Sequence, residues 1–215
     1  MKLTGRIKNV LLSGLFLGAM AYNLVWTDAA VSNEKLTAVT GEPTITVEQA
    51  EAYLHKINPK APYLAKIYEA EGKLEGIRWD VAFAQSIKET GFWRFGGDVL
   101  AKQNNFARLG ASNTRSGGKG AWFKTPTEGI RAQIQHLKAY AGTEALKGKL
   151  VDPRFKYVTR GYAPYVQWLG AADNPKNAER KKKGEPALGW AIPGKGYGNN
   201  ILVIIDKIST EKTDR

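Results

Sequence analysis

A carboxylate at the end of a predicted helix is the strongest candidate for chemistry in this sequence. The run QSIKETGFWRFGG, residues 85–97, carries an apolar helical pattern that ends on Glu89, two positions before Gly91. The helix dipole disfavours an anion at a C-terminus, and burial among the aromatic residues of 92–95 would also raise the pKa of this carboxyl group. A carboxyl group that keeps its proton near neutral pH can act as a general acid. The alternative interpretation is an exposed glutamate beside Lys88.

The residues around this glutamate resemble a known family. The run VAFAQSIKETGFWRFGGDVLAKQNNFARLGA, residues 81–111, resembles the core of bacterial glucosaminidase domains, which have Glu-Ser/Thr-Gly-aromatic at a helix end and then Asn-Asn-aromatic. The later runs TPTEGIRAQIQHLKAYA, DPRFKYVTRG and GKGYGNNILVII are similar to a branch of that family. The resemblance covers about residues 60–206. It implies a lysozyme-like fold and hydrolysis of the β-1,4 bond after N-acetylglucosamine in peptidoglycan, with Glu89 as the general acid.

The resemblance also implies residues that shape the glycan cleft beneath the acid. Asn104, Asn105 and Phe106 follow the predicted helix at the family's spacing. Asparagine amides offer both donors and acceptors, which suits the N-acetyl and hydroxyl groups of sugars. Four tryptophans are candidates for stacking on sugar faces, with Trp122 preferred: Trp93, Trp122, Trp168 and Trp190. Core packing is the alternative for each tryptophan, and a simple turn is the alternative for the asparagines.

The second catalytic group stays open. Glycosidases usually use two carboxyl groups, and many members of the family place the second in a β-containing lobe. Between Phe106 and Lys124 this chain has no Asp or Glu. Glu128, at the third position of a predicted helix, and Asp98, after a Gly-Gly pair, are the remaining acidic candidates, and each also suits a capping role.

Two other mechanisms need no second carboxylate from the protein. The N-acetyl group of the substrate could attack, oriented by a tyrosine, and Tyr157 stands closest to where the family pattern has one. The other available tyrosines are Tyr162, Tyr165 and Tyr197. A lytic transglycosylase would also need one acid only. A non-catalytic glycan-binding module that has lost its base is the hypothesis from another class.

Metal and cofactor chemistry is not indicated. The sequence has no cysteine and only two histidines, His55 and His136, which have no paired ligand spacing and are expected at the surface or on helix flanks. We therefore expect no metal site and no cofactor.

The elements around these residues predict a mainly helical domain. The fold class expected is α+β, mainly α-helical and lysozyme-like, with a small irregular β-containing lobe. Residues 46–210 form the catalytic domain, 31–45 a linker and 211–215 a tail. In the lobe, 108–111 and 121–125 are the expected arms of a β-ribbon. Apolar residues recur at helical spacing in the segments 46–57, 63–76, 78–90, 125–141, 162–169 and 199–210.

The N-terminus predicts export, and the charge predicts an anionic partner. Lys2, Arg6 and Lys8 precede an apolar run at 10–26, which suits a signal peptide or a membrane anchor over residues 1–30. The catalytic domain is then expected outside the cell or in the wall, bound to peptidoglycan glycan strands. The net charge of +12 suits an anionic wall polymer or a membrane surface. No nucleic-acid module is recognisable, and we expect a monomer.

Overall fold

A computed structural model describes residues 35–111 and 120–213 of the protein. The described residues form α-helices joined by irregular segments and short 3-10 turns. The α-helices are α1 (Val47–Ile57), α2 (Ala65–Glu75), α3 (Trp79–Thr90), α4 (Pro126–Ala141), α5 (Lys176–Lys182) and α6 (Tyr197–Ser209). The 3-10 turns are Ala101–Gln103, Phe155–Tyr157 and Val166–Leu169.

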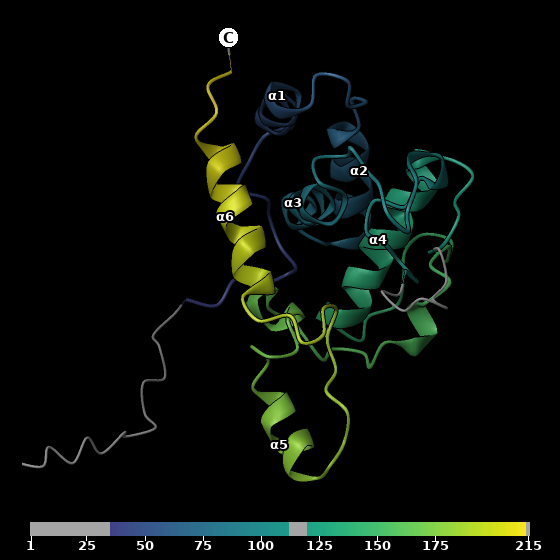
Figure 1. The fold of residues 1–215 in the computed structure, drawn as a ribbon, viewed down its shortest axis with the longest axis vertical. Coiled ribbons are helices and arrows are strands. Elements are labelled where there is room, and N and C mark those ends of the chain that lie inside the picture. Colours follow the sequence, from purple (N-terminus) through teal and green to yellow (C-terminus); the bar gives the residue numbers. More distant parts are fainter. Residues whose placement is uncertain (1–34, 112–119, 214–215) are drawn as a thin grey trace, which may run out of the picture. The chain divides into compact units, whose positions relative to one another are not determined.

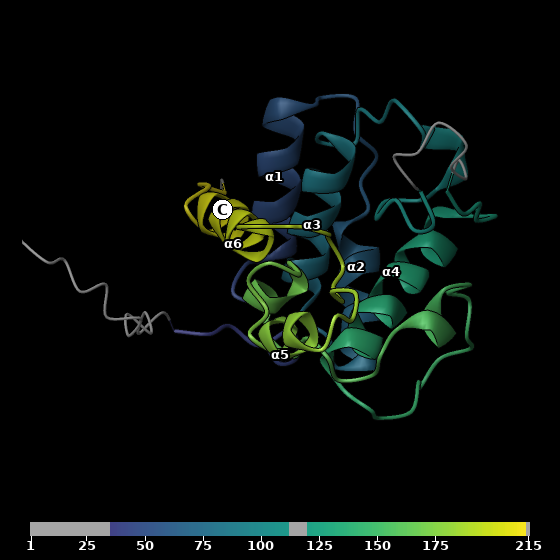
Figure 2. The same ribbon diagram turned by 60° about the horizontal axis from the view of Figure 1, so that its bottom comes forward.

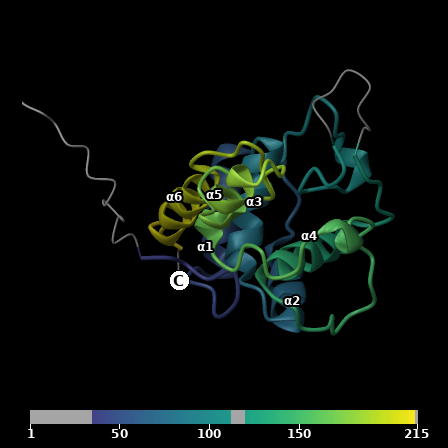
Figure 3. The same ribbon diagram turned by 90° about the horizontal axis from the view of Figure 1, so that it is seen from below.

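Helix α3 is the centre of the core. Every side chain from Val81 to Ile87 is buried, as expected of a helix whose small and apolar residues leave no polar face. The helix lies between α6 and α4 and also contacts α1 and α2 (Figures 1 and 3). Figure 2 shows α1 and α3 alongside each other. A residue at the end of α3 is therefore held from several sides.

The helix boundaries follow local signals in the sequence. Thr46 and Thr125 accept hydrogen bonds from backbone N–H groups in the first turns of α1 and α4, and Pro126 opens α4. Helix α3 ends at Gly91, whose φ of 59° lies in the left-handed region that glycine adopts most easily. These ends agree with the predicted helices.

Residues 35–45, expected as a linker, pack into the same compact unit as the helices. Val39 donates its N–H to the Pro164 carbonyl at 2.9 Å and accepts from the Arg78 N–H at 2.9 Å. Thr37 accepts from the Val166 N–H at 2.8 Å. This segment therefore joins the start of α3 to the region that precedes α5.

The lobe between α3 and α4 is less regular than the predicted β-ribbon. Its described residues form isolated bridges, such as Gly96 with Val99, and no continuous strand. The expected arms do meet, because the Ala121 N–H donates to the Leu109 carbonyl at 2.7 Å. Of the expected tip, 112–120, all but Gly120 lies outside the described residues. The mostly helical architecture agrees with the predicted class, and the β lobe is not seen in the described part.

The polar, highly charged segment 171–186, which is not among the predicted helices, contains helix α5. Helix α5 and its flanking segments extend away from α1–α4 (Figure 1). The Asn174 side chain accepts the Lys176 N–H at 3.0 Å, and Lys183 pairs with Glu179 one turn earlier at 2.8 Å. These local contacts supply helix-forming interactions that the hydrophobic pattern did not reveal.

No described helix is long and apolar enough to cross a bilayer. The apolar run at 10–26, predicted to be a signal or an anchor, lies outside the described residues.

Candidate active site

Glu89 lies in the last turn of α3, at the edge of the core. It is half-buried and lines a cavity of about 200 Å³. The chain turns away immediately after it at Gly91 and returns along the irregular lobe. The other residues lining this cavity are Thr90, Gly91, Phe95, Gly96, Val99 and Arg108.

Tyr197 contacts this carboxylate directly. It lies at the start of α6, is buried, and donates its hydroxyl hydrogen to Glu89 Oε1. The same hydroxyl oxygen accepts a hydrogen bond from Gln85 Nε2 at 3.1 Å. Because Gln85 supplies a hydrogen to this oxygen, the phenolic hydrogen is directed at Glu89.

The surroundings raise the pKa of Glu89 above its ordinary value. Burial is the main cause, because it disfavours the charged form. The Tyr197 hydroxyl, the nearby charges of Lys88 and Arg108, and the Trp190 side chain act in the opposite direction and limit the rise. Burial and the neighbouring carboxylate together raise the pKa of Tyr197 well above its usual value, so this phenol remains a donor.

A buried hydrogen-bond network on the core side holds Gln85, and through it Tyr197, in place. Gln133 on α4 donates to Gln85 Oε1 and to the Ala82 carbonyl, both at 2.8 Å. The Tyr68 hydroxyl on α2 donates to Gln133 Oε1 at 3.0 Å. Because all these atoms are buried and paired, the network holds α2, α3, α4 and α6 in one arrangement at the base of the site.

A second cavity of about 420 Å³ shares a lining residue with the first. Arg108 lines both cavities, and Trp190 lines the larger one while also acting on Glu89. The two cavities therefore lie next to each other at Arg108, and together they are called the cleft. The other residues lining the larger cavity are Ala107, Leu109, Gly110, Ala111, His136, Tyr140, Arg154, Tyr157, Val158 and Gly189.

A histidine–aspartate pair forms part of the wall of the larger cavity. The Nδ1 atom of His136 lies 2.7 Å from Asp152 Oδ2, and both residues are buried. The imidazole packs edge-on against Trp190, with a ring-centre distance of 4.9 Å. The expectation that His136 lies at the surface or on a helix flank is thus wrong, because its position on α4 faces the cleft side of the core.

The comparisons with known proteins identify the family. Residues 65–210 match the glucosaminidase family, described as mannosyl-glycoprotein endo-beta-N-acetylglucosaminidase. This chain belongs to the glucosaminidase domain family. The membership supports a glycoside hydrolase that acts on peptidoglycan.

One relative and the solved structures complete the comparison. An uncharacterized protein of Borreliella burgdorferi is 38% identical over 169 residues, which are 70% of this chain and 82% of that protein. No solved structure matches the chain.

The asparagines predicted to shape the cleft hold the lobe together. Asn104 donates its amide to the Phe123 carbonyl at 3.0 Å. Asn105 is buried, donates to the Leu109 carbonyl at 2.9 Å and accepts the Leu109 N–H at 2.8 Å. Phe106 is also buried and packs in the core. In the glucosaminidase domain these three residues therefore position the Ala107–Ala111 wall of the cleft.

Of the tryptophans predicted as sugar platforms, Trp93 and the preferred Trp122 lie outside the linings of both cavities. Trp93 is buried, and its Nε1–H donates to Ser86 Oγ at 2.9 Å. Trp122 is 59% exposed and lies under the ammonium group of Lys102. The tryptophan that lines the cleft is Trp190.

The structure separates the candidates for the second catalytic group. Glu128 Oε2 accepts the Lys124 N–H at 2.8 Å, which is a contact of a helix start. Asp98 is exposed and lies 3.8 Å from Arg108. Tyr157 is 66% exposed and lines the larger cavity, not the one that Glu89 lines. The tyrosine brought to the acid is Tyr197, which residue type alone could not rank above the others.

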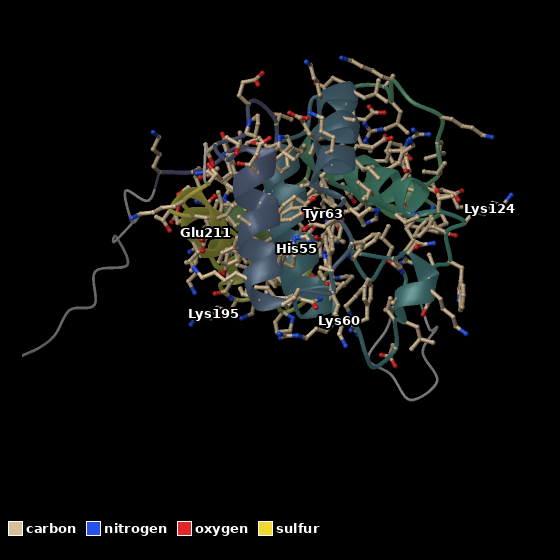
Figure 4. The ribbon with its side chains drawn as sticks, turned by 90° about the horizontal axis from the view of Figure 1, so that it is seen from above. His55, Lys60, Tyr63, Lys124, Lys195 and Glu211 are labelled. Atoms are coloured by element: carbon tan, nitrogen blue, oxygen red, sulfur yellow. The ribbon has the colours of Figure 1, made fainter. Side chains whose placement is uncertain are left out.

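No group of three metal-ligating side chains occurs among the residues at 35–111 and 120–213. His55 stacks on Tyr63 with a ring-centre distance of 4.0 Å, and the two lie side by side in Figure 4. Its ring nitrogens approach the carbonyls of Glu51 and Ala61, each at 2.8 Å. This histidine is therefore engaged in local packing at the end of α1.

Proposed function

We propose that this protein is an endo-β-N-acetylglucosaminidase that cleaves peptidoglycan after N-acetylglucosamine, with Glu89 as the general acid. The observation that carries the proposal is the half-buried carboxyl group of Glu89 at the inner end of the cleft, hydrogen-bonded to Tyr197. Its raised pKa supports a proton held for transfer. The leaving sugar oxygen would receive this proton as the glycosidic bond breaks.

The remaining step is assigned to the substrate itself. Apart from Glu89, no residue that lines the two described cavities has a carboxylate. We therefore assign the attack on C1 to the carbonyl oxygen of the substrate's N-acetyl group, which forms a bond to C1 as the glycosidic oxygen leaves with the proton. Water then opens the cyclic intermediate and returns a proton to Glu89. The Tyr197 hydroxyl stabilises the Glu89 carboxylate between these steps.

The proposed location is the cell wall, after export or anchoring by residues 1–30. The basic n-region and the apolar run support it. The net charge of +12 adds a long-range attraction to an anionic wall.

The test is cleavage of purified peptidoglycan by the full chain, with the new ends identified by mass spectrometry. Reducing N-acetylglucosamine ends are expected. Anhydromuramic ends would instead identify a lytic transglycosylase, and no cleavage would favour a glycan-binding module.

A Glu89→Gln variant examines the acid itself. Glutamine keeps the shape but cannot donate a proton as an acid, so the rate is expected to fall at least 100-fold. Glu69→Gln is the matched control, because Glu69 pairs with Lys66 on the surface of α2. Equal rates for Glu89→Gln and the wild type would refute the assignment.

A further inference from the structure

The larger cavity has an unusual balance of charge for a sugar site. Its lining includes two guanidinium groups, from Arg108 and Arg154, and the imidazole of His136, but no carboxylate. Neutral sugars need donors and acceptors in similar numbers, whereas a guanidinium offers donors only. The chemistry of this lining therefore fits a ligand that carries a negative charge.

Both guanidinium groups remain available for a ligand. The Arg154 guanidinium lies over the Tyr157 ring at 5.5 Å, and the described residues give it no side-chain hydrogen bond. Arg108 approaches Asp98 at 3.8 Å, beyond ordinary hydrogen-bond distance. An anion that entered the cavity would not have to displace a tight internal ion pair.

Asp152 holds the backbone at Arg154 and the ring of His136, and its carboxylate is not part of the cavity lining. One of its oxygens accepts the backbone N–H of Arg154 at 2.8 Å, and the other lies 2.7 Å from His136 Nδ1. The carboxylate is fully buried behind these groups. With Nδ1 engaged, Nε2 is the ring nitrogen of His136 that can meet a ligand.

We propose that this cavity binds a carboxylate carried by the muramyl residue, next to the bond that Glu89 cleaves. The inference rests on the proposed function, and it adds a specificity site to it. Arg108 and Arg154 hold the carboxylate through charge-assisted hydrogen bonds. The indole of Trp190 lies between this anion site and the acid. The carboxylate comes either from the lactyl ether of N-acetylmuramic acid or from the attached peptide.

The test is calorimetric binding to the full-length Glu89→Gln variant, which needs no turnover. The ligands are the N-acetylglucosaminyl-N-acetylmuramic acid disaccharide, its lactyl methyl ester, the disaccharide with a stem peptide, and the same peptide-bearing disaccharide with its carboxylates amidated. Loss of the recognised carboxylate should weaken binding about tenfold or more. The acid–ester pair reports on the lactyl source, and the peptide–amide pair reports on the peptide source.

Substitutions locate the effect. Arg154→Ala and Arg108→Ala, each added to Glu89→Gln, should remove the preference for the carboxylate, and Arg154→Lys should keep part of it. Lys182→Ala is the matched control, since it removes one positive charge from exposed α5. A preference that survives both alanine variants would overturn the proposal, as would equal binding within both ligand pairs. Equal competition by inorganic phosphate would also overturn it, because it would show a general anion site.

The two proposals fail in different ways. If the carboxylate preference holds but peptidoglycan is not cleaved, the anion site is real and the hydrolase assignment is wrong. If cleavage occurs without any carboxylate preference, the hydrolase assignment holds and the anion site is wrong.

Discussion

Tyr197 donates its hydroxyl hydrogen to the carboxylate of Glu89, which lies 108 positions earlier in the chain. The contact joins the first turn of α6 to the last turn of α3. The phenol is buried and the carboxyl group is half-buried, so the pair is shielded from bulk water on the core side and opens toward the cleft. In the proposed mechanism, the leaving glycosidic oxygen would receive its proton on the side of this pair that faces the cleft.

Replacing Tyr197 by Phe is expected to move the pH profile upward. The hydroxyl lowers the pKa of Glu89, so its removal lets burial raise that pKa further. Activity that needs protonated Glu89 is lost as pH rises through this pKa, and the alkaline limb of kcat/KM should therefore shift to higher pH. The measurement is kcat/KM against pH on a soluble glycan.

Tyr162→Phe is the control for that profile, since the Tyr162 hydroxyl donates to Asn177 at 2.8 Å, away from the acid. An alkaline limb that stays in place or moves to lower pH in Tyr197→Phe would contradict the role given to this hydroxyl.

Replacing Gln85 by Met should weaken both stability and catalysis. The thioether cannot donate to Tyr197 or accept from Gln133, so a buried amide donor loses a partner. The free energy of unfolding is expected to fall by about 1–3 kcal/mol, and kcat should fall because the tyrosine is less firmly directed at Glu89. Urea unfolding of Gln85→Met, Gln133→Met and the double variant checks this, with a double-variant cost below the sum. Strict additivity would show that the two amides are not coupled.

Replacing Lys138 by Ala should destabilise the fold in a pH-dependent way. Burial opposes ionisation of Glu75, but the Lys138 ammonium at 2.6 Å and the N–H groups of Lys147 and Gly148 outweigh it and lower its pKa. At neutral pH the free energy of unfolding is expected to fall by about 3–5 kcal/mol, because the buried Glu75 carboxylate loses the Lys138 ammonium group.

The loss of stability in Lys138→Ala should depend on pH. A lowered pKa contributes stability above the unfolded-state value, and that contribution is lost as pH falls through the folded-state value. The deficit of Lys138→Ala should therefore shrink in acid, as measured by urea unfolding at a series of pH values. Lys66→Ala, at an exposed pair, should change stability by less than about 1 kcal/mol. A deficit that grows in acid would refute this account.

Replacing Gly129 by Ala should displace the lobe from α4. An ideal Cβ at this position would lie 1.7 Å from the Asn104 carbonyl oxygen, so the backbone must move. We expect the free energy of unfolding to fall by about 1–3 kcal/mol because of overpacking. We also expect lower activity, because Arg108 lies in the same lobe segment as Asn104 and would be displaced with it. Thermal unfolding and turnover measure both effects, with Thr127→Ala in the same turn as the control. A variant with wild-type stability would show that α4 and the lobe are not tightly apposed.

Local signals in the sequence were enough for the main helices and for the position of Glu89 in the last turn of α3. The end of α3 at Gly91 and the start of α4 at Thr125 depend on neighbouring residues, which the sequence displays directly. Helix α5 was not predicted, because its residues are almost all polar and lack an apolar stripe. Its stabilising contacts are short-range polar ones, which a hydrophobic pattern does not report.

The rest of the site depends on contacts between distant residues. Sequence spacing could not choose Tyr197 among four tyrosines, because its partner lies on another helix. It also could not place His136 in the cleft wall, since the decisive partner, Asp152, follows α4 in an irregular segment. The chemistry of Asn104 and Asn105 suits contacts with sugars, yet their amides form hydrogen bonds inside the lobe.

The position of Tyr197 on α6 also has a consequence for biosynthesis. A ribosome completes the acid-bearing helix more than one hundred residues before it completes the phenol. A nascent or truncated chain that lacks α6 would carry Glu89 without its hydrogen-bond donor and without the helix that covers one side of α3. The hydrogen bond between Tyr197 and Glu89 can therefore form only after α6 has been synthesised, and a chain that stops before α6 would lack the hydroxyl that limits the rise in the pKa of Glu89.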